Sequence, residues 1–260
     1  MSEKTKRLTE TVRVHIEKLS EEPYAAILCY PRPSDRELQS RIAELREHGV
    51  NEVEFSGATT VVNLPVLGKG FVGVVIVAYL NGQKVALKIR RVDADRASLH
   101  REAELLAKAN AVQVGPRLIG VSKNFLLMQY IEGKALFEWL VAHKDKTLVS
   151  RVLTDILEQC WRLDSIGLDH GELSKAPKHL MVDGQAKPWI VDFETASLSR
   201  RPANVTAVCQ FLFTSCSTVA RAVAEVLGER KRDLIIDALR HYKNERTREN
   251  FSQVAQICLA

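Results

Sequence analysis

The sequence predicts an α+β protein with two lobes, a small one built on an antiparallel sheet and a larger helical one, preceded by an α/β extension. Three observations lead to this fold class. Strand signals are concentrated between residues 61 and 130, helical spacing of apolar residues dominates from Leu136 onward, and the N-terminal segment follows a strand–helix–strand pattern of its own. A chain of 260 residues is long enough for one large domain or two lobes. The expected parts are an extension over 1–57, a sheet lobe over 58–133 and a helical lobe over 134–260.

Composition and charge are those of an ordinary globular protein. Hydrophobic residues make up 46% and charged residues 27% of the chain, which argues against collagenous and disordered proteins. The net charge of +5 does not by itself indicate nucleic acid, so association with nucleic acid or a ribonucleoprotein stays open. The five cysteines never form Cys-x-x-Cys, so no disulfide framework or zinc site is expected. Without a long apolar run or a signal-like N-terminus, we expect a cytoplasmic protein with no membrane partner.

The extension contains one well-marked helix between less certain elements. Residues 1–22 alternate like a strand at Val12 and Val14 but also repeat like a helix, which we slightly favour. The apolar run from 25 to 30 is interpreted as a buried strand, and a strand is also expected over 52–55. Between them, a helix begins at Ser34 or Asp35 and ends at His48-Gly49. A segment this short needs a partner surface for its apolar side, so we expect it to be docked.

The sheet of the first lobe is predicted from runs of β-branched and apolar residues. Strands are expected over 61–67, 71–80, 84–90, 118–122 and 125–130, with a helix over 95–110. Asn81-Gly82 joins two of the strands and is a strong hairpin signal. Gly133 breaks the strand pattern, and the helical lobe follows, interrupted by short strands near 180–183 and 188–192.

A glycine-rich motif lies at the start of the second strand of this sheet. Gly68, Gly70 and Gly73 fit G-x-G-x-x-G, and Val75 completes G-x-G-x-x-G-x-V. Glycines allow backbone N–H groups to approach phosphate oxygens without interference from a β-carbon. A dinucleotide-binding fold requires a helix after this loop, whereas a strand follows here, so that fold is excluded. A plain hairpin turn is the alternative interpretation.

A lysine on the next strand and a glutamate on the following helix form the second motif. Lys88 is the last residue of Val-Ala-Leu-Lys, so the aliphatic part of its side chain is expected among apolar residues. Its ammonium group then needs an anion. Glu102 and Glu104 are the candidate partners. Glu102 shares a helix face with three leucines, whereas Glu104 shares one with charged residues, so we choose Glu102.

With these motifs in this order, the chain resembles the N-terminal lobe of a protein kinase. The segment from Asp169 to Ser174 is similar to the H-R-D-L catalytic loop, with Gly171 for Arg and Glu172 for Asp, and 190–194 is similar to the D-F-G segment. The His-Gly pair and the small size resemble the RIO kinases and the kinase of the KEOPS complex, and most of all predicted archaeal serine/threonine kinases with H-G-E-L-S and D-F-E. The resemblance covers about residues 60–225.

The resemblance implies a bilobal kinase fold that binds ATP with Mg²⁺ or Mn²⁺. Gly68, Gly70 and Gly73 would cover the phosphates, Lys88 would bind them, and Glu102 would hold Lys88. The residues from Met128 to Glu132, including Tyr130, would form the hinge beside adenine. Val75 and Ala86 would close the apolar slot above the ring.

The catalytic residues follow from the same resemblance, with departures. Asp192 would bind the metal and Glu172 would accept the hydroxyl proton, although Glu is one methylene longer than Asp. The usual Asn is absent and His179 is the best match, which is a poor ligand for magnesium. Glu194, in the place of Gly, could supply the missing metal ligand.

The segment after Glu194 lacks A-P-E, and Asn204 is expected to cap the next helix only ten residues later. An extended peptide platform is therefore not expected. The leading hypothesis is transfer of phosphate from ATP to a Ser or Thr hydroxyl of a protein, including the chain itself. The alternatives are a nucleotide-binding pseudokinase that acts as a regulatory module, and a small-molecule kinase.

Overall fold

The computed structural model describes residues 11–175 and 177–259, which divide into two compact units. The first comprises residues up to Glu104 together with Arg117–Tyr130, and the second comprises Leu105–Pro116 together with the chain from Ile131 onward. The chain therefore passes from one unit to the other after Glu104, after Pro116 and after Tyr130. Among the described residues, no single helix is long and apolar enough to cross a membrane, and only the bent pair 204–214 and 218–227 meets that criterion when taken together.

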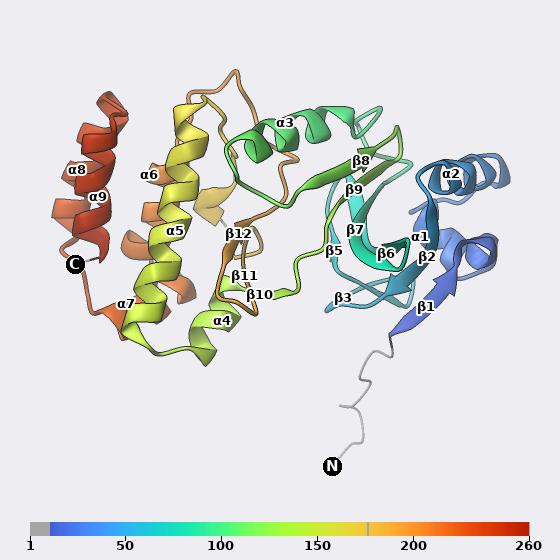
Figure 1. Ribbon diagram of the computed structural model, residues 1–260, viewed down its shortest axis with the longest axis horizontal. Helices are drawn as coiled ribbons and strands as arrows, with labels where there is room; N and C mark the ends of the chain where they lie inside the picture. Colours follow the sequence, from blue (N-terminus) through green and yellow to red (C-terminus); the bar gives the residue numbers. More distant parts are fainter. Residues whose placement is uncertain (1–10, 176, 260) are drawn as a thin grey trace, which may run out of the picture. The chain divides into compact units, whose positions relative to one another are not determined.

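An antiparallel sheet is the centre of the first unit (Figure 1). Its strands are, in spatial order, β1 (Val12–His15), β2 (Val50–Phe55), β6 (Gly73–Leu80), β7 (Gln83–Arg90), β9 (Phe125–Gln129) and β8 (Leu118–Val121), with β5 (Gly68–Lys69) beside β6. The sheet and its order confirm the predicted α+β fold class. Asn81 and Gly82 join β6 to β7 with φ of 49° and 80°, the left-handed geometry that a two-residue hairpin requires.

Helices cover the two faces of this sheet with separate apolar clusters. One face packs against η1 (Ile16–Ser20), α1 (Tyr24–Leu28) and α2 (Asp35–Glu47), where Leu45 lies against the same cluster as Ile76 and Leu87. On the other face, Leu126 and Val72 cluster with Leu99 and Ala103 at the start of α3 (His100–Ala111). Residues two apart on β7 point to the same face, and Val85, Leu87 and Ile89 of this strand all belong to the first cluster.

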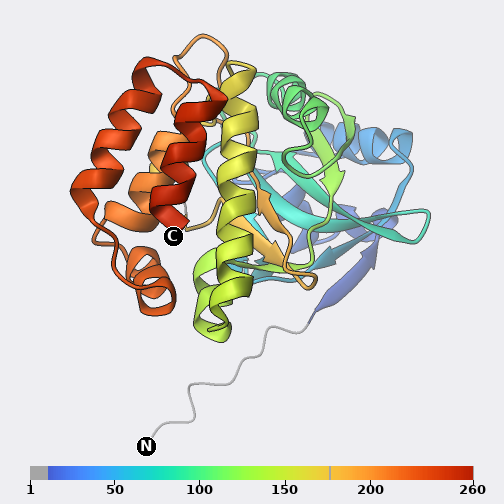
Figure 2. The same ribbon diagram turned by 60° about the vertical axis from the view of Figure 1, so that its left-hand side comes forward.

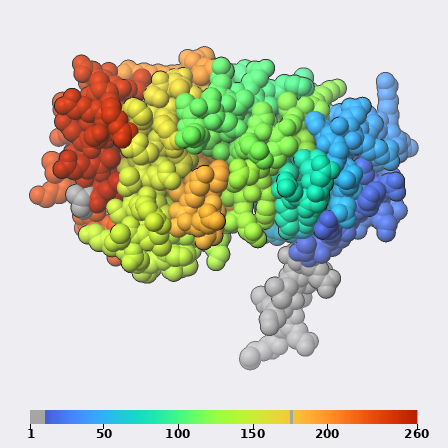
Figure 3. Space-filling model, viewed as in Figure 1, coloured from blue at the N-terminus to red at the C-terminus, as the bar shows by residue number. Residues whose placement is uncertain are grey.

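The extension is part of the sheet. β2 pairs with β6 over Val53↔Ala78 and Glu54↔Val77, which confirms that the segment is docked. The space-filling view shows the blue extension and the teal strands in contact (Figure 3). Helix α2 follows Ser34 and ends at Glu47, as predicted, with Gly49 in the left-handed region at φ 74°.

Two predictions for the extension were wrong. Residues 12–15 form a strand, because the alternating Val12 and Val14 pair with β2 and Val14 is buried; residues 1–10 lie outside the described residues. The run from 25 to 30 is largely helical, and Cys29 N donates to Ala25 O at 3.0 Å. Ala25, Ile27 and Leu28 are buried in the first apolar cluster, so the run is buried by packing on the sheet and not by pairing as a strand.

Other predicted boundaries of strands and helices also differ from those in the structure. The strand predicted over 61–67 is a hairpin of β3 (Thr59–Val61) and β4 (Leu64–Val66), with Val62 and Asn63 at positive φ in the turn. Helix α3 begins at His100 and not at Asp95, because Arg96 O and Leu99 N bond outside the helix, to Arg90 and Lys123. Gly133 begins a strand of the second unit.

The second unit is helical around a small sheet, as predicted (Figure 2). Its strands are β10 (Gly133–Ala135), β11 (Leu180–Asp183) and β12 (Pro188–Ile190). Its helices are α4 (Leu136–Ala142), α5 (Lys146–Ser165), η2 (Leu173–Lys175), α6 (Asn204–Cys209), η3 (Gln210–Thr214), α7 (Thr218–Leu227), α8 (Arg232–Asn244) and α9 (Arg248–Leu259). Asp145 caps α5 by accepting from Leu148 N at 2.6 Å. The buried face of α5 includes Ile156, Leu157 and Cys160, and α9 lies beside this helix.

Candidate functional site

The predicted lysine and glutamate form a buried ion pair in the first unit. Lys88 Nζ lies 2.8 Å from Glu102 Oε1, and the two side chains are 4% and 3% exposed. Lys88 lies on β7 opposite Leu126 of β9, and Glu102 lies in the first turn of α3. Glu104 is exposed, so the choice based on helix faces is confirmed.

The glycine loop is a tight connection from β5 to β6. Gly70 N donates to Gly73 O at 2.8 Å, and Phe71 at the tip is 92% exposed. A β-carbon on Gly73 would lie 2.8 Å from Ile89 O and 3.1 Å from Lys88 Cγ. Gly73 is thus required for the close approach of the lysine stem, whereas a β-carbon on Gly68 would meet nothing within 4 Å.

The residues expected around adenine lie on neighbouring strands. Val75 is opposite Lys88 in the β6–β7 register, and Ala86 is opposite Met128 in the β7–β9 register. Val75, Met128 and Tyr130 are half-buried, and Ala86 is 8% exposed. Their contact with an adenine ring stays a prediction.

Three residues of the second unit converge from three segments of the chain. Glu172 belongs to the catalytic-loop-like segment, His179 precedes β11, and Asp192 follows β12. His179 Nε2 lies 3.1 Å from Glu172 Oε2, and His179 Nδ1 lies 3.8 Å from Asp192 Oδ2. The ring is 13% exposed and each carboxylate 40%. This arrangement can hold a cation, or orient Glu172 through the imidazole.

The backbone at Asp192 is unusual. Its φ is 69°, which is uncommon for a residue other than glycine and is frequent at functional sites. The neighbouring Phe193 is 2% exposed, and its ring lies edge-on to that of His170 with centroids 5.1 Å apart. The buried phenylalanine thus fixes the chain on the C-terminal side of the Asp192 carboxylate.

His170 is a buried, neutral anchor of the catalytic-loop-like segment. It is 0% exposed, and its Nε2 lies 3.1 Å from Val191 O. Burial, followed by repulsion from His179, lowers the pKa of His170 to about 4. The imidazole is therefore uncharged at neutral pH, and its ring connects the loop to the strand that leads to Asp192.

Asn204 supports the same loop, a role that the sequence analysis missed. The residue expected to cap α6 is the first residue of that helix, and the capping position is Ala203. The side chain of Asn204 instead accepts from His170 N at 2.8 Å and donates to Asp164 Oδ1 at 2.7 Å and Leu168 O at 2.7 Å. No local pattern points to this pairing, because 34 residues separate Asn204 from His170.

Asp164 is the buried carboxylate that holds Asn204 in place. Its carboxylate accepts from the backbone N–H groups of Asn204 and Val205 and from Tyr242 OH. Burial raises the pKa of Asp164, and these hydrogen bonds oppose the shift. The loop is thereby connected to α5, α6 and α8.

Gly171 provides space for an arginine from another segment. A β-carbon at this position would overlap Arg200 Nη2 and would lie 3.0 Å from Thr195 Oγ1, and its φ is 90°. Arg200 Nε lies 2.9 Å from Asp169 Oδ2. The glycine that replaces the usual arginine thus lets the guanidinium of Arg200 lie against the loop at the position that precedes Glu172 in the sequence.

The structure brings together two of the three residues of the predicted metal set, His179 and Asp192, and their binding of a metal stays a prediction. Among the described residues, the group whose ligand atoms lie within 4.8 Å of one another consists of Glu172, His179 and Asp192, and Glu194 is not a member. Glu194 comes two residues after Asp192, whereas Glu172 comes from the loop supported by Asn204. Two carboxylates fit a hard divalent cation, and the imidazole suits a transition ion such as Mn²⁺ better than Mg²⁺.

Comparison with known proteins identifies the family. A sequence model of the RIO domain matches residues 76–222, which is more than half of the chain. The chain belongs to the RIO domain family. This is a family of atypical kinases, so the predicted relationship to RIO kinases is confirmed. At the level of the family, the activity is phosphoryl transfer of the protein-kinase type. Such kinases generally use ATP and Mg²⁺.

Individual relatives are more distant. CBL-interacting serine/threonine-protein kinase 3 of Arabidopsis thaliana is 27% identical over 164 residues, or 58% of this chain and 35% of that protein. CBL-interacting protein kinase 8 of Oryza sativa subsp. japonica is 28% identical over 170 residues, or 59% and 35%. An uncharacterized protein of Methanocaldococcus jannaschii is 29% identical over 101 residues, or 39% and 84%. The chain spans about a third of the length of the plant kinases it matches.

Proposed function

We propose that this chain transfers the γ-phosphoryl group of ATP to a Ser or Thr hydroxyl of a protein, including its own. The observation that carries the proposal is the convergence of Glu172, His179 and Asp192 within 4.8 Å in a chain of the RIO family. A proton acceptor and a metal-binding carboxylate at one place are the groups that phosphoryl transfer needs.

Each residue has a separate task in this proposal. Lys88, held by Glu102, binds ATP phosphates, and Asp192 with a second ligand holds the divalent cation. The cation, when bound, neutralises phosphate charge. Glu172 accepts the proton of the acceptor hydroxyl, and His179 keeps the carboxylate in place through the 3.1 Å contact.

A pseudokinase is the second candidate, and two observations favour it. Glu172 is longer than the aspartate of the usual loop, and His179 stands in the place of the usual asparagine. If these changes prevent transfer, the chain binds nucleotide through Lys88 and acts through its partners. The two candidates predict the same ATP binding and differ only in turnover.

Incubation with γ-labelled ATP and either Mg²⁺ or Mn²⁺ tests the proposal, with and without added protein substrates. Glu172→Gln keeps the size of the side chain but removes its charge, so transfer should fall about 10²-fold or more while ATP binding is retained. Glu225→Gln is the matched control, because Glu225 pairs with Lys144 on the surface, and it should keep the native rate. Glu172→Asp shows whether the loop geometry requires the longer residue.

The outcomes separate the candidates. Label on Ser or Thr that depends on Glu172 supports the proposal, whereas equal transfer by the native protein and Glu172→Gln removes this residue from the mechanism. ATP binding without transfer in either metal identifies the pseudokinase. Label that reaches only a small molecule contradicts the protein substrate.

A further inference from the structure

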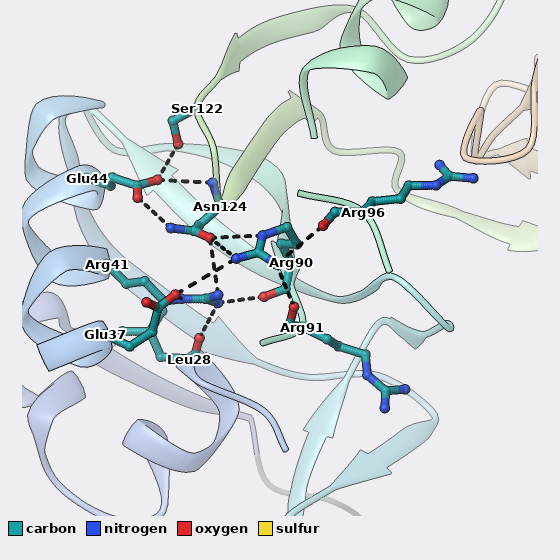
Figure 4. Close-up of polar contacts among 9 residues, drawn as sticks. All are labelled: Leu28, Glu37, Arg41, Glu44, Arg90, Arg91, Arg96, Ser122 and Asn124. Carbon is teal, nitrogen blue, oxygen red and sulfur yellow. Dashed lines mark hydrogen bonds and ion pairs between the residues drawn. The ribbon is translucent and has the colours of Figure 1, made fainter. Parts of the chain in front are cut away.

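A polar network connects the extension to the end of β7, close to Lys88. Arg41 on α2 is 0% exposed, and its guanidinium donates to Leu28 O at 2.8 Å, to Arg90 O at 2.5 Å and to Asn124 Oδ1 at 3.2 Å. Its Nε donates to Glu37 Oε1 at 2.9 Å. Figure 4 shows the guanidinium groups of Arg41 and Arg90 meeting at the side chain of Asn124.

Arg90 is the second arginine of this network and is two residues from Lys88 on the same strand. Its Nε and Nη2 donate to Asn124 Oδ1 at 3.0 and 2.8 Å, and its Nη1 donates to Arg96 O at 3.4 Å. Glu44 holds Asn124 from the other side, with 2.6 Å between its Oε1 and Asn124 Nδ2. One amide oxygen thus accepts from two arginines.

Burying two guanidinium groups side by side costs free energy, through desolvation and through repulsion between the two charges. Burial, and then repulsion from Arg41, lowers the pKa of Arg90, while Glu37 and Glu44 oppose the shift. Apolar residues of similar volume would often stabilise such a position as well or better. An arrangement of this kind is therefore better explained by what it positions than by the stability it adds.

The network leads directly to the first turn of α3. Arg90 bonds to Arg96 O in the connection before the helix, and Leu99 N donates to Lys123 O at 3.2 Å, in the same turn as Asn124. Glu102 lies in this first turn, where Ala103 N donates to Leu99 O. The contacts of α2 thus reach, through Arg90 and Asn124, the segment that precedes the turn carrying Glu102.

The extension also contacts the glycine loop. Lys69 Nζ donates to Tyr30 OH at 2.6 Å, and Val92 N donates to Tyr30 O at 2.9 Å. Arg91, next to Arg90, donates to Gly70 O at 3.2 Å. Both phosphate-binding elements of the first unit, the loop and the Lys88–Glu102 pair, are thus held from the extension.

We infer that Arg41 is a positioning residue, through which the N-terminal extension holds the first turn of α3 so that Glu102 keeps Lys88 in place for ATP. The inference rests on the proposed function, because it concerns the same nucleotide-binding residues. It assigns to residues 11–57 a role in nucleotide affinity.

The test replaces Arg41 with lysine and measures the Kd for ATP with Mg²⁺, using a fluorescent ATP analogue. Lysine keeps the charge, but a single ammonium group cannot reach Leu28 O, Arg90 O and Asn124 together. Coupling within one network is expected to weaken ATP binding about tenfold. Arg13→Lys is the matched control, because Arg13 is an exposed arginine of the same extension that pairs with Glu52, and its Kd should stay within about twofold of native.

A double-mutant cycle separates positioning from general support. If Arg41 acts through the ion pair, adding Arg41→Lys to Glu102→Gln should leave the Kd of Glu102→Gln nearly unchanged. Losses that multiply in the double variant would overturn the inference. Cooperative unfolding is checked for every variant at the temperature of the titration. If Arg41→Lys does not unfold cooperatively, the cycle uses Glu44→Gln instead. Glu44 is half-buried and binds the same Asn124 side chain.

Failure of the proposed function and failure of this inference would give different results. No ATP binding by the native protein would overturn the proposed function and this inference with it. Native binding that Glu102→Gln weakens, with multiplying losses in the cycle, would overturn the inference alone.

Discussion

The buried ion pair makes a specific prediction about two glutamates on one helix. Replacing Glu102 with glutamine removes the negative charge that lies 2.8 Å from the Lys88 ammonium, whose side chain is 4% exposed. Removing one partner of a buried pair costs about 3–5 kcal/mol, and the lower end applies here because glutamine keeps an acceptor oxygen. For a chain of this size, 1 kcal/mol corresponds to about 2–4 °C, so Tm should fall by about 6–12 °C.

Thermal unfolding followed by circular dichroism measures this change. Glu104→Gln is the control, because Glu104 lies two residues away on the exposed face and should change Tm by less than about 2 °C. ATP with Mg²⁺ should raise Tm of the native protein by linkage and raise that of Glu102→Gln less. Equal losses of Tm in both variants, or a loss in Glu104→Gln alone, would refute the assignment of Glu102 as the partner of Lys88.

Two further predictions concern the catalytic-loop-like segment and the docked extension. Gly171→Ala should destabilise the protein by about 1–2 kcal/mol, because residue 171 has a left-handed φ and an added β-carbon would overlap Arg200. Gly184→Ala is the control and should not destabilise it, because the space around Gly184 is open. Equal Tm values for the two variants would contradict this reasoning. Burial raises the pKa of Glu54, but hydrogen bonds from Tyr79, Lys84 and Ser56 outweigh it, and the net pKa is lowered. The stability that this carboxylate contributes is therefore present above its unfolded pKa and is lost as the pH falls through the acidic range. Tyr79→Phe should lower Tm more at pH 7 than at about pH 3, measured by thermal unfolding, and a constant difference would show that the hydrogen bond to Glu54 is not the cause.

The sequence alone determined the features that depend on neighbours along the chain. The Asn81-Gly82 turn, the strand that carries Lys88 and the helix face that selects Glu102 follow from local spacing, and the structure has each of them. The glycine loop and the D-F-E segment were found in the same way, because their residues are contiguous. The match to the RIO domain over 76–222 includes Lys88, Glu102 and the D-F-E segment, whereas the glycine loop lies just before it.

Only the tertiary structure decided which distant residues meet. Asn204 was expected to cap a helix, but its amide supports His170, and Glu172 takes the place expected for Glu194 beside His179 and Asp192. Nothing in local spacing distinguishes these alternatives.

The apolar run from 25 to 30 and Arg41 illustrate the same limit. The run packs on the sheet as helix α1, and a short apolar run by itself does not distinguish a buried strand from a buried helix. Arg41 lies on the same face of α2 as Leu38 and Leu45 and is 0% exposed, but helix spacing does not reveal which groups accept its hydrogen bonds. Its acceptors lie 13, 49 and 83 residues away, so only the packing of α2 on the sheet brings them within hydrogen-bond distance and makes burial of the charge possible.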